Sequence, residues 1–275
     1  MTIDAHHHLW KYNHRDYVWM NGSMDALRRD FLLADAREVM QAAGVDGAVT
    51  VQARQMLEET EWLLDLAAAD GFIRGVVGWV PLVNLDVRGH LERLAPHAKL
   101  KGVRHVLHDE PDDFYMLRAD FNRGVGLLKE FDLAYDILIF ERHLRQTIEL
   151  VDRHPNQRFV VDHIAKPRIR ERVLSQWRED LHELAERPNV YCKLSGMVTE
   201  AAWPSWTSKD LQPFFETALS AFGPNRLMFG SDWPVLTLAS DYQTWIDTVL
   251  GFIAGLSPAE HTRICAGTAV EVYQL

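Results

Sequence analysis

Short apolar runs rich in β-branched residues alternate along the chain with longer segments in which apolar residues recur every three or four positions. The first pattern predicts buried strands, and the second predicts amphipathic helices. We expect strands at residues 2–8, 47–54, 74–82, 100–106, 134–140, 158–164, 190–196 and 226–234. Helical segments follow them at residues 33–44, 58–71, 88–98, 121–131, 142–154, 170–187, 211–223 and 242–255.

Eight strand–helix units in one unbroken series predict parallel strands joined by crossover helices, and eight such units close a (β/α)₈ TIM barrel. The fold class is therefore α/β, with a single domain over residues 1–275, because no linker or repeat divides the chain. An open doubly wound sheet is the alternative, but it normally carries a glycine-rich turn after its first strand. Here that turn reads HHHLWKYNH. Near the end, Ser257 and Pro258 predict the start of a closing helix, which Gly267 would break.

Composition and charge limit the kinds of macromolecule that the protein is expected to bind. A formal net charge of -10 argues against a nucleic-acid or anionic-membrane surface. The two cysteines, Cys192 and Cys265, lie far apart, which suits a reducing compartment better than a disulfide framework. The apolar runs are too short or interrupted to span a membrane, and no secretory signal precedes the first strand. We therefore expect a cytoplasmic protein, a monomer or homodimer, without a nucleic-acid or membrane partner.

Polar side chains collect where the expected strands end, which in a barrel is the mouth that carries the active site. Side chains alternate along a strand, so Asp4, His6 and His8 are expected on one face, pointing inward, and His7 on the other, facing a helix. The aromatic stretch 10–20 follows the first strand and is expected to cover the mouth. The candidate residues near strand ends are His6, His8, Gln52, Arg54, Trp79, Arg104, His105, Asp136, His163, Lys166, Lys193 and Asp232.

Two imidazoles on one strand face, with a carboxylate from a neighbouring strand, form a donor set for a divalent transition metal. His6 and His8 supply the imidazoles, and Asp232 supplies the carboxylate if the last strand closes against the first. Two buried histidines with satisfied hydrogen bonds are the alternative. A purification-tag remnant is disfavoured, because the run is short and apolar residues follow it at once. Lys193 lies inside a strand, where it is costly to bury without an anionic partner or ligand.

The stretches DAHHHLW, DHIAKP, VYCKLSGMVTE and LMFGSDWPV, in this order, resemble the amidohydrolase superfamily along essentially the whole chain. Within it, the chain resembles the branch of sugar-acid lactonases of the L-fuconolactone and L-rhamnonolactone type, and the stretch FERHL is part of that likeness. The resemblance implies a (β/α)₈ barrel in which His6 and His8 on the first strand, His163 on the sixth and Asp232 on the eighth form the site.

The chain departs from the superfamily pattern at two strands. The fifth strand offers Asp136 where the superfamily has a histidine, and the fourth has no glutamate and no obvious bridging lysine. Two imidazoles and one carboxylate make a smaller donor set than a binuclear centre needs. We therefore expect one divalent metal ion, zinc before other metals, bound by His6, His8 and Asp232 and either weakly held or dispensable.

The resemblance implies hydrolysis of a sugar-acid lactone, which would be the small-molecule partner. Asp232 would act as general base on water and then return the proton to the leaving alkoxide. His163, Lys193 or a bound cation would stabilise the oxyanion. The alternatives are a metal-dependent decarboxylase of the same superfamily and a non-catalytic ligand-binding barrel. The expected substrate-binding residues are Gln52, Arg54, Trp79, Arg104, His105, Asp136 and Lys166.

Overall fold

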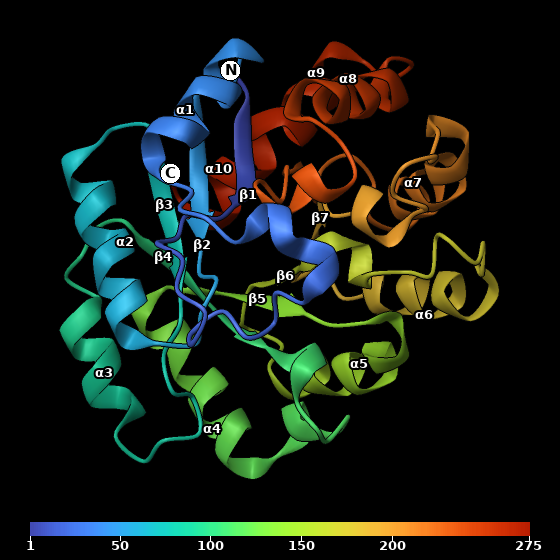
Figure 1. Ribbon diagram of the computed structural model, residues 1–275. Coiled ribbons are helices and arrows are strands. Elements are labelled where there is room, and N and C mark those ends of the chain that lie inside the picture. The colour runs from blue at the N-terminus through green and yellow to red at the C-terminus, as the bar shows by residue number, and fades with distance from the viewer.

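The structure, a computed structural model, describes residues 1–275. Its eight strands form one parallel sheet in the order β1 to β8 (Figure 1). The sheet closes on itself, because the His8 N–H donates to the Trp233 carbonyl at 2.7 Å and the Asp232 N–H donates to the His6 carbonyl at 2.8 Å. The predicted (β/α)₈ barrel is confirmed. The strands are β1 Ile3–His7, β2 Gly47–Val51, β3 Ile73–Gly78, β4 Leu100–Val106, β5 Ala134–Leu138, β6 Phe159–Val161, β7 Val190–Leu194 and β8 Leu227–Phe229.

An α-helix follows each strand and lays its apolar face on the outside of the barrel. In α5, Leu144, Ile148 and Val151 recur at helical spacing and are buried, whereas Arg145 between them is exposed. The helices are α1 Leu33–Ala42, α2 Leu57–Ala69, α3 Val87–Leu94, α4 Ala119–Leu128, α5 Leu144–Arg153, α6 Ser175–Ala185, α7 Ser208–Phe222, α8 Tyr242–Ile253, α9 Pro258–Thr262 and α10 Thr268–Tyr273.

Two apolar clusters form the core. The larger one lies between the strands and the surrounding helices. The smaller one fills the barrel itself, where side chains such as Val49, Val51 and Val77 meet Val272 and Tyr273 of α10. In Figure 1 the loop after β1 crosses in front of the strands and α10 lies behind them, so α10 closes the end of the barrel opposite the mouth.

Strand β1 contains a bulge that corrects one expectation. Asp4 pairs with Ala48 and His7 pairs with Thr50, so three steps along β1 match two steps along β2. Ala5 therefore joins the apolar cluster inside the barrel, and Asp4 points outward to accept a hydrogen bond from the Tyr242 hydroxyl at 2.9 Å. The expectation that Asp4 shares a face with His6 and His8 is wrong, because alternation restarts after the bulge.

The closing helix begins where the sequence predicts, but it does not end there. Ser257 caps α9 and Pro258 occupies its first turn, as predicted. The prediction that Gly267 breaks the helix is wrong, because Gly267 has a helical φ of -58° and ends a π-helical turn that continues directly into α10. Strands β6 and β8 are shorter than predicted, since the polar residues after Val161 and Phe229 have already left the sheet.

The aromatic stretch after β1 is folded onto the body of the protein. Trp10 and Tyr17 are buried, and Trp10 forms a two-hydrogen-bond antiparallel bridge with Phe31. Arg54 holds this stretch against the barrel, because its guanidinium pairs with Asp16 at 2.5 Å and lies over the ring of Tyr17. This arrangement leaves the stretch on the catalytic side of the barrel, as its position after a strand predicts.

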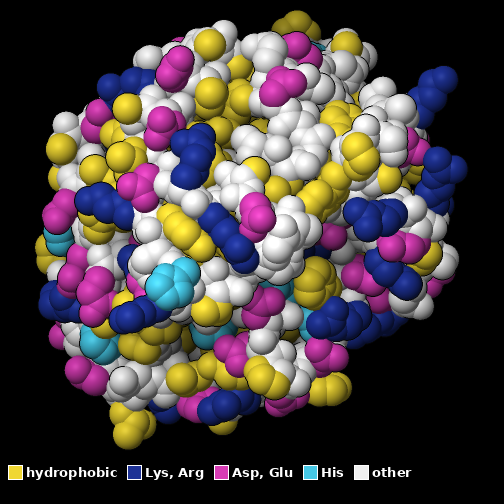
Figure 2. Space-filling model, viewed as in Figure 1, with side chains coloured by type: hydrophobic (Ala, Val, Ile, Leu, Met, Phe, Trp, Pro, Cys, Tyr) yellow, Lys and Arg dark blue, Asp and Glu magenta, His cyan; other side chains and the backbone are white.

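Two findings bear on possible macromolecular partners. None of the helices is long and apolar enough to cross a membrane. Figure 2 shows Lys and Arg side chains interspersed with Asp and Glu side chains on the face that carries the mouth. This face therefore lacks the continuous basic surface that nucleic-acid binding proteins present.

Close packing of α4 against the loop after β3 yields a prediction of stability. A methyl group on Gly124 would meet the backbone carbonyl of Leu82 well inside van der Waals contact, whereas one on Gly126 would have His154 at 3.5 Å as its nearest neighbour. We expect Gly124→Ala to lower the free energy of unfolding by about 1–3 kcal/mol through overpacking. Gly126→Ala, its control in the same helix, should leave stability unchanged or raise it by up to about 1 kcal/mol. Urea denaturation of both variants measures the difference, and equal effects would contradict it.

Candidate active site

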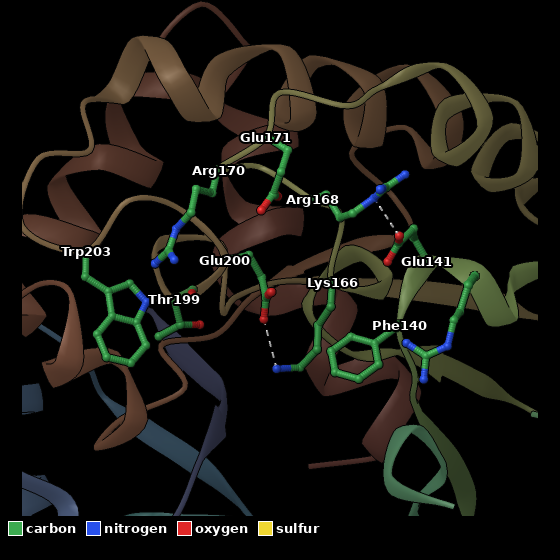
Figure 3. Close-up of a pocket in the computed structure, with 10 residues that line it drawn as sticks. Phe140, Glu141, Lys166, Arg168, Arg170, Glu171, Thr199, Glu200 and Trp203 are labelled. Carbon is green, nitrogen blue, oxygen red and sulfur yellow. Dashed lines mark hydrogen bonds and ion pairs between the residues drawn. The ribbon is translucent and has the colours of Figure 1, made fainter. Parts of the chain in front are cut away.

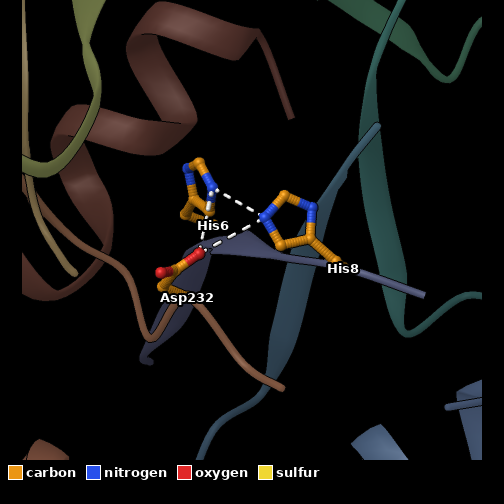
Figure 4. A group of neighbouring side chains, drawn as sticks. All are labelled: His6, His8 and Asp232. Carbon is orange, nitrogen blue, oxygen red and sulfur yellow. Dashed lines mark hydrogen bonds and ion pairs between the residues drawn. The ribbon is translucent and has the colours of Figure 1, made fainter. Parts of the chain in front are cut away.

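Three of the predicted residues converge at the mouth of the barrel (Figure 4). The Nε2 atoms of His6 and His8 lie 3.2 Å apart, and Oδ1 of Asp232 lies 3.6 Å from the first and 3.3 Å from the second. All three side chains are buried. The imidazoles come from β1 and the residue directly after it, and the turn after β8 supplies the carboxylate. This cluster therefore depends on closure of the barrel between β8 and β1.

The donor set fits a divalent transition metal. Ligand atoms at about 2.0–2.1 Å from a tetrahedral zinc ion stand about 3.3–3.4 Å apart, close to the three separations in the cluster. The Nδ1 atom of His8 lies 2.8 Å from the Val51 carbonyl oxygen, so Nδ1 carries the proton and Nε2 keeps its lone pair for a ligand. His6, His8 and Asp232 can therefore hold one metal ion.

Electrostatics fix the charge states of the central groups. Burial alone would raise the pKa of Asp232, but His163, His8 and His6 outweigh burial and hold that pKa well below its usual value. The Asp232 carboxylate is thus ionised near neutral pH. Burial lowers the pKa of His163 to about 4, although Asp232 opposes the shift, so this imidazole is neutral near pH 7.

His163 reaches the cluster through a left-handed turn after β6, in which residues 163–166 all have positive φ. The turn is held by a hydrogen bond from the Lys166 N–H to the His163 carbonyl at 2.8 Å. It places Nε2 of His163 3.8 Å from Oδ1 of Asp232. Left-handed backbone costs about 1–2 kcal/mol per non-glycine residue, and such strain is typical of functional sites.

The sequence KLSG, at the end of β7 and just after it, makes room for the ring of His163 and orients it. The hydroxyl of Ser195 lies 2.8 Å from Nδ1 of His163 and is buried with it. Gly196 has a φ of +61°, and a Cβ there would stand 2.5 Å from the same nitrogen. Only glycine leaves room for the ring at this distance, so Ser195 and Gly196 together fix the orientation of His163.

Directly beneath His6 lies a buried ion cluster. The ammonium of Lys193 is 2.5 Å from Oδ2 of Asp136 and 3.0 Å from Oδ1 of Asp162. Arg104 donates to the other oxygen of Asp162 at 3.0 Å and to the backbone carbonyl of Gln52 at 2.5 Å. The structure thus gives Lys193 the anionic partners that its burial demands. It also brings together the predicted residues Gln52, Arg104, Asp136 and Lys193.

Asp162 is a site residue that the sequence did not reveal. It touches Lys193 and Arg104, and its Oδ1 lies 3.2 Å from Nδ1 of His6. Burial alone would raise the pKa of Asp162, but Lys193 and His6 outweigh it and hold that pKa well below its usual value. Its position directly before His163 in DHIAKP was the available signal. Alternation argued against it, since neighbours in a strand face opposite ways.

Three predicted substrate-binding residues lie away from the central cluster. Arg54 is occupied by Asp16 and Glu59. Trp79 donates from its indole to Nδ1 of His105 at 3.3 Å, and His105 in turn lies 2.6 Å from Glu110. His105 follows Arg104 in β4 and therefore points away from the barrel interior. These contacts hold protein segments together, and the substrate-binding role of all three residues stays a prediction.

A cavity of about 350 Å³ opens beside the cluster on the same face (Figure 3). The loops after β5, β6 and β7 form it, and the aromatic rings of Phe140 and Trp203 stand on opposite sides in the view. Lys166 lies between them and pairs with Glu200 at 3.1 Å. Burial would lower the pKa of Lys166, but Glu200 and Asp232 outweigh it and raise that pKa, so the cavity and the cluster are electrostatically linked.

Fold and site together define a class: α/β-barrel enzymes whose mouth carries imidazole and carboxylate groups able to bind a metal ion and activate water. The family model described as amidohydrolase matches residues 3–275, and the chain belongs to this family. The resemblance seen in the sequence motifs is thereby confirmed.

The relatives are similar along their whole length. The chain is 40% identical to an L-fucono-1,5-lactonase of Burkholderia multivorans, over 100% of this chain and 96% of that protein. It is 36% identical to an L-fucono-1,5-lactonase of Burkholderia ambifaria, over 99% of this chain and 95% of that protein. A crystal structure of an amidohydrolase from Burkholderia multivorans with bound zinc is 41% identical, covers 100% of this chain and 99% of that chain, and has a TM-score of 0.95.

Decarboxylases are more distant. The 5-carboxyvanillate decarboxylase of Sphingomonas paucimobilis is 14% identical, with a TM-score of 0.69, over 100% of this chain and 99% of that chain. At this identity the likeness extends to the fold alone. The decarboxylase alternative therefore lacks the support that the lactonase prediction receives from the full-length relatives.

The donor geometry predicts which histidine matters for metal binding. We expect His8→Gln to weaken zinc affinity by more than about 100-fold, because loss of an outer-shell partner alone costs about 10–100-fold. His7→Gln is the matched control, since His7 is equally buried but its Nε2 lies 3.1 Å from the Thr50 hydroxyl on the other face of β1. Competition with a chromogenic zinc indicator measures both affinities. Equal losses would contradict the proposed side-chain directions.

Proposed function

We propose that this protein is a lactonase that hydrolyses a sugar-acid lactone of the L-fucono-1,5-lactone type to the open-chain acid. The observation that carries the proposal is the ionised Asp232 carboxylate, enclosed by His6, His8 and His163 within 3.8 Å, at the mouth of a chain 40% identical to such an enzyme. A carboxylate beside neutral imidazoles such as His6 and His163 can accept a proton from water beside a bound carbonyl group.

Asp232 is the proposed general base. Water held against Oδ1 attacks the lactone carbonyl and gives its proton to the carboxylate, which produces a tetrahedral intermediate. Collapse of that intermediate breaks the bond to the ring oxygen, and Asp232 returns the proton to this leaving alkoxide. The products are a carboxylic acid and a free hydroxyl group, so the net change is the addition of one water molecule.

His163 is the proposed oxyanion donor. The Ser195 hydroxyl can donate to Nδ1 of His163 across 2.8 Å, which leaves the proton of the neutral ring on Nε2, the nitrogen that faces Asp232. An N–H group held in this way stabilises the charge that develops on the carbonyl oxygen. Lys193 is a poorer candidate, because its ammonium is fully buried and already has Asp136 and Asp162 as partners.

The metal ion is proposed to be zinc, weakly held. When bound by His6, His8 and Asp232, such an ion would act as a Lewis acid on the carbonyl or would lower the pKa of a bound water molecule. The fixed guanidinium of Arg104 lies only 3.3 Å from Nε2 of His6. A permanent cation beside a ligand atom opposes a second cation, which supports weak binding.

The cavity beside the cluster is the proposed substrate chamber. Its charged side chains can exchange hydrogen bonds with sugar hydroxyl groups, and Phe140 and Trp203 offer apolar faces for the C–H side of a sugar ring. Lys166 borders both the chamber and Asp232 and would hold the substrate near the carbonyl-activating groups. Free thiols at Cys192 and Cys265 support a reducing, cytoplasmic setting, and we propose a monomer or homodimer.

The function is tested with a panel of sugar lactones, with and without chelator, read by acid release. We expect hydrolysis by the purified protein, and we expect Asp232→Asn to lower kcat by about 10²- to 10⁴-fold with little change in KM. Asp152→Asn is the control, because it makes the same chemical change at an exposed ion pair with Arg187. Full activity in Asp232→Asn would overturn the role of Asp232. Loss of carbon dioxide from aromatic acids without lactone hydrolysis would instead support the decarboxylase.

The depressed pKa of His163 predicts the acid limb of the activity profile. A base with a pKa of about 4 is neutral at every pH above that value and becomes protonated as the pH falls through it. The imidazolium would pair with Asp232 and remove its ability to accept a proton. We therefore expect kcat/KM to stay flat from pH 8 to about pH 5 and to fall below that, while circular dichroism confirms folding. A fall centred near pH 6.5, the ordinary value for histidine, would contradict this assignment.

A further inference from the structure

A continuous column of buried polar groups joins the last helix of the chain to His6. Tyr273 of α10 donates its hydroxyl to Asp136, with its oxygen 2.9 Å from Oδ1 and 2.8 Å from Oδ2. Asp136 accepts from Lys193 at 2.5 Å, and the same ammonium lies 3.1 Å from Nδ1 of His6. All four side chains are buried, so the column crosses the barrel from its closed end to its mouth.

Asp136 and His6 accept hydrogen bonds from the ammonium of Lys193. The same ammonium forms an ion pair with Asp162 across 3.0 Å, although Oδ1 of Asp162 accepts no hydrogen bond in the structure. The position of the ammonium is therefore set by the two carboxylates. The aromatic ring of Tyr273 also lies beneath it, with its centroid 5.4 Å from Nζ. Tyr273 donates to one of these carboxylates, Asp136, and so contributes to the setting of the ammonium.

His6 responds to the position of the ammonium because two groups reach the same nitrogen with opposite requirements. Lys193 can only donate to Nδ1, which places the proton of the neutral ring on Nε2. Asp162, 3.2 Å from Nδ1, can only accept, which requires the proton on Nδ1. Arg104 can only donate to Nε2, from 3.3 Å, and so favours a lone pair on that nitrogen. The position of the Lys193 ammonium relative to Asp162 thus decides whether Nδ1 carries the proton and leaves Nε2 its lone pair at the mouth.

We propose that Tyr273 is a positioning residue of the active site, which acts through Asp136 and Lys193 to fix the orientation and tautomer of His6. Its effect on turnover rests on the proposed lactonase function, whereas its effect on His6 does not. The C-terminal helix therefore does more than close the barrel. It supports the ion cluster on which His6 rests.

The test replaces Tyr273 by phenylalanine, which removes the hydroxyl and keeps the ring. Tyr135→Phe is the matched control, because Tyr135 is the neighbour of Asp136 in β5, is equally buried and makes no hydrogen bond to another side chain. Nitrogen-15 NMR of the histidine rings, with His6 assigned from a His6→Asn variant, reports the tautomer directly. Lactone kinetics and zinc affinity are measured on the same samples.

We expect Tyr273→Phe to change the His6 nitrogen shifts, lower kcat by about 10-fold and leave KM within about twofold, as loss of an outer-shell partner does. Asp136→Asn, which keeps an acceptor for Tyr273 but removes the charge, should change the same signals in the same direction. Tyr135→Phe should leave them unchanged. Unchanged His6 signals in a folded Tyr273→Phe protein would overturn the proposal, even if stability or kcat falls. If the parent protein hydrolyses no lactone, the proposed function fails while the His6 signals still decide this inference.

Discussion

The ammonium of Lys193, held between two carboxylates in the dry interior of the barrel, is the interaction on which the site depends. Its partners Asp136 and Asp162 come from β5 and the turn after β6, and none of the three side chains is exposed to solvent. Removing one member of a buried ion pair costs about 3–5 kcal/mol, because the other charge is left uncompensated. The cluster therefore locks three neighbouring elements in one arrangement, directly below His6.

Charge balance around this cluster distinguishes Asp232 from the other buried carboxylates. Three buried carboxylates, Asp136, Asp162 and Asp232, face two fixed cations, Lys193 and Arg104. The two cations are paired with the two deeper carboxylates, so the uncompensated negative charge lies on Asp232 at the mouth. The imidazoles around it are largely neutral, since burial lowers the pKa of His6 and His163. The Asp232 carboxylate is thus the one group of the three that is free to bind a proton or a metal ion.

The sequence predicted the barrel and the central triad because both follow from local, repeated patterns. The alternation of strands and helices can be read from the sequence without knowledge of tertiary packing. Polar residues at the ends of the strands must then meet at the mouth of the barrel. The bulge in β1 could not be predicted from the sequence, because it is defined by pairing with β2 and not by residue types. Asp162 was missed for a related reason. The chain leaves β6 at Val161, and the left-handed turn that follows abolishes the two-residue period on which the expectation rested.

Tyr273 shows a different limit of sequence reasoning. Its position near the end of the chain, in a helix separated from Asp136 by more than a hundred residues, gives no local sign of a contact. The contact exists because α10 closes the barrel, where Ala269 of the helix and Ala266 of the turn before it pack in the cluster inside the strands. A barrel filled by aliphatic side chains alone would leave Lys193 as the only side chain that donates a hydrogen bond to Asp136. The helix supplies a hydroxyl that donates to Asp136 of the ion cluster, which connects closure of the fold to the geometry of the site.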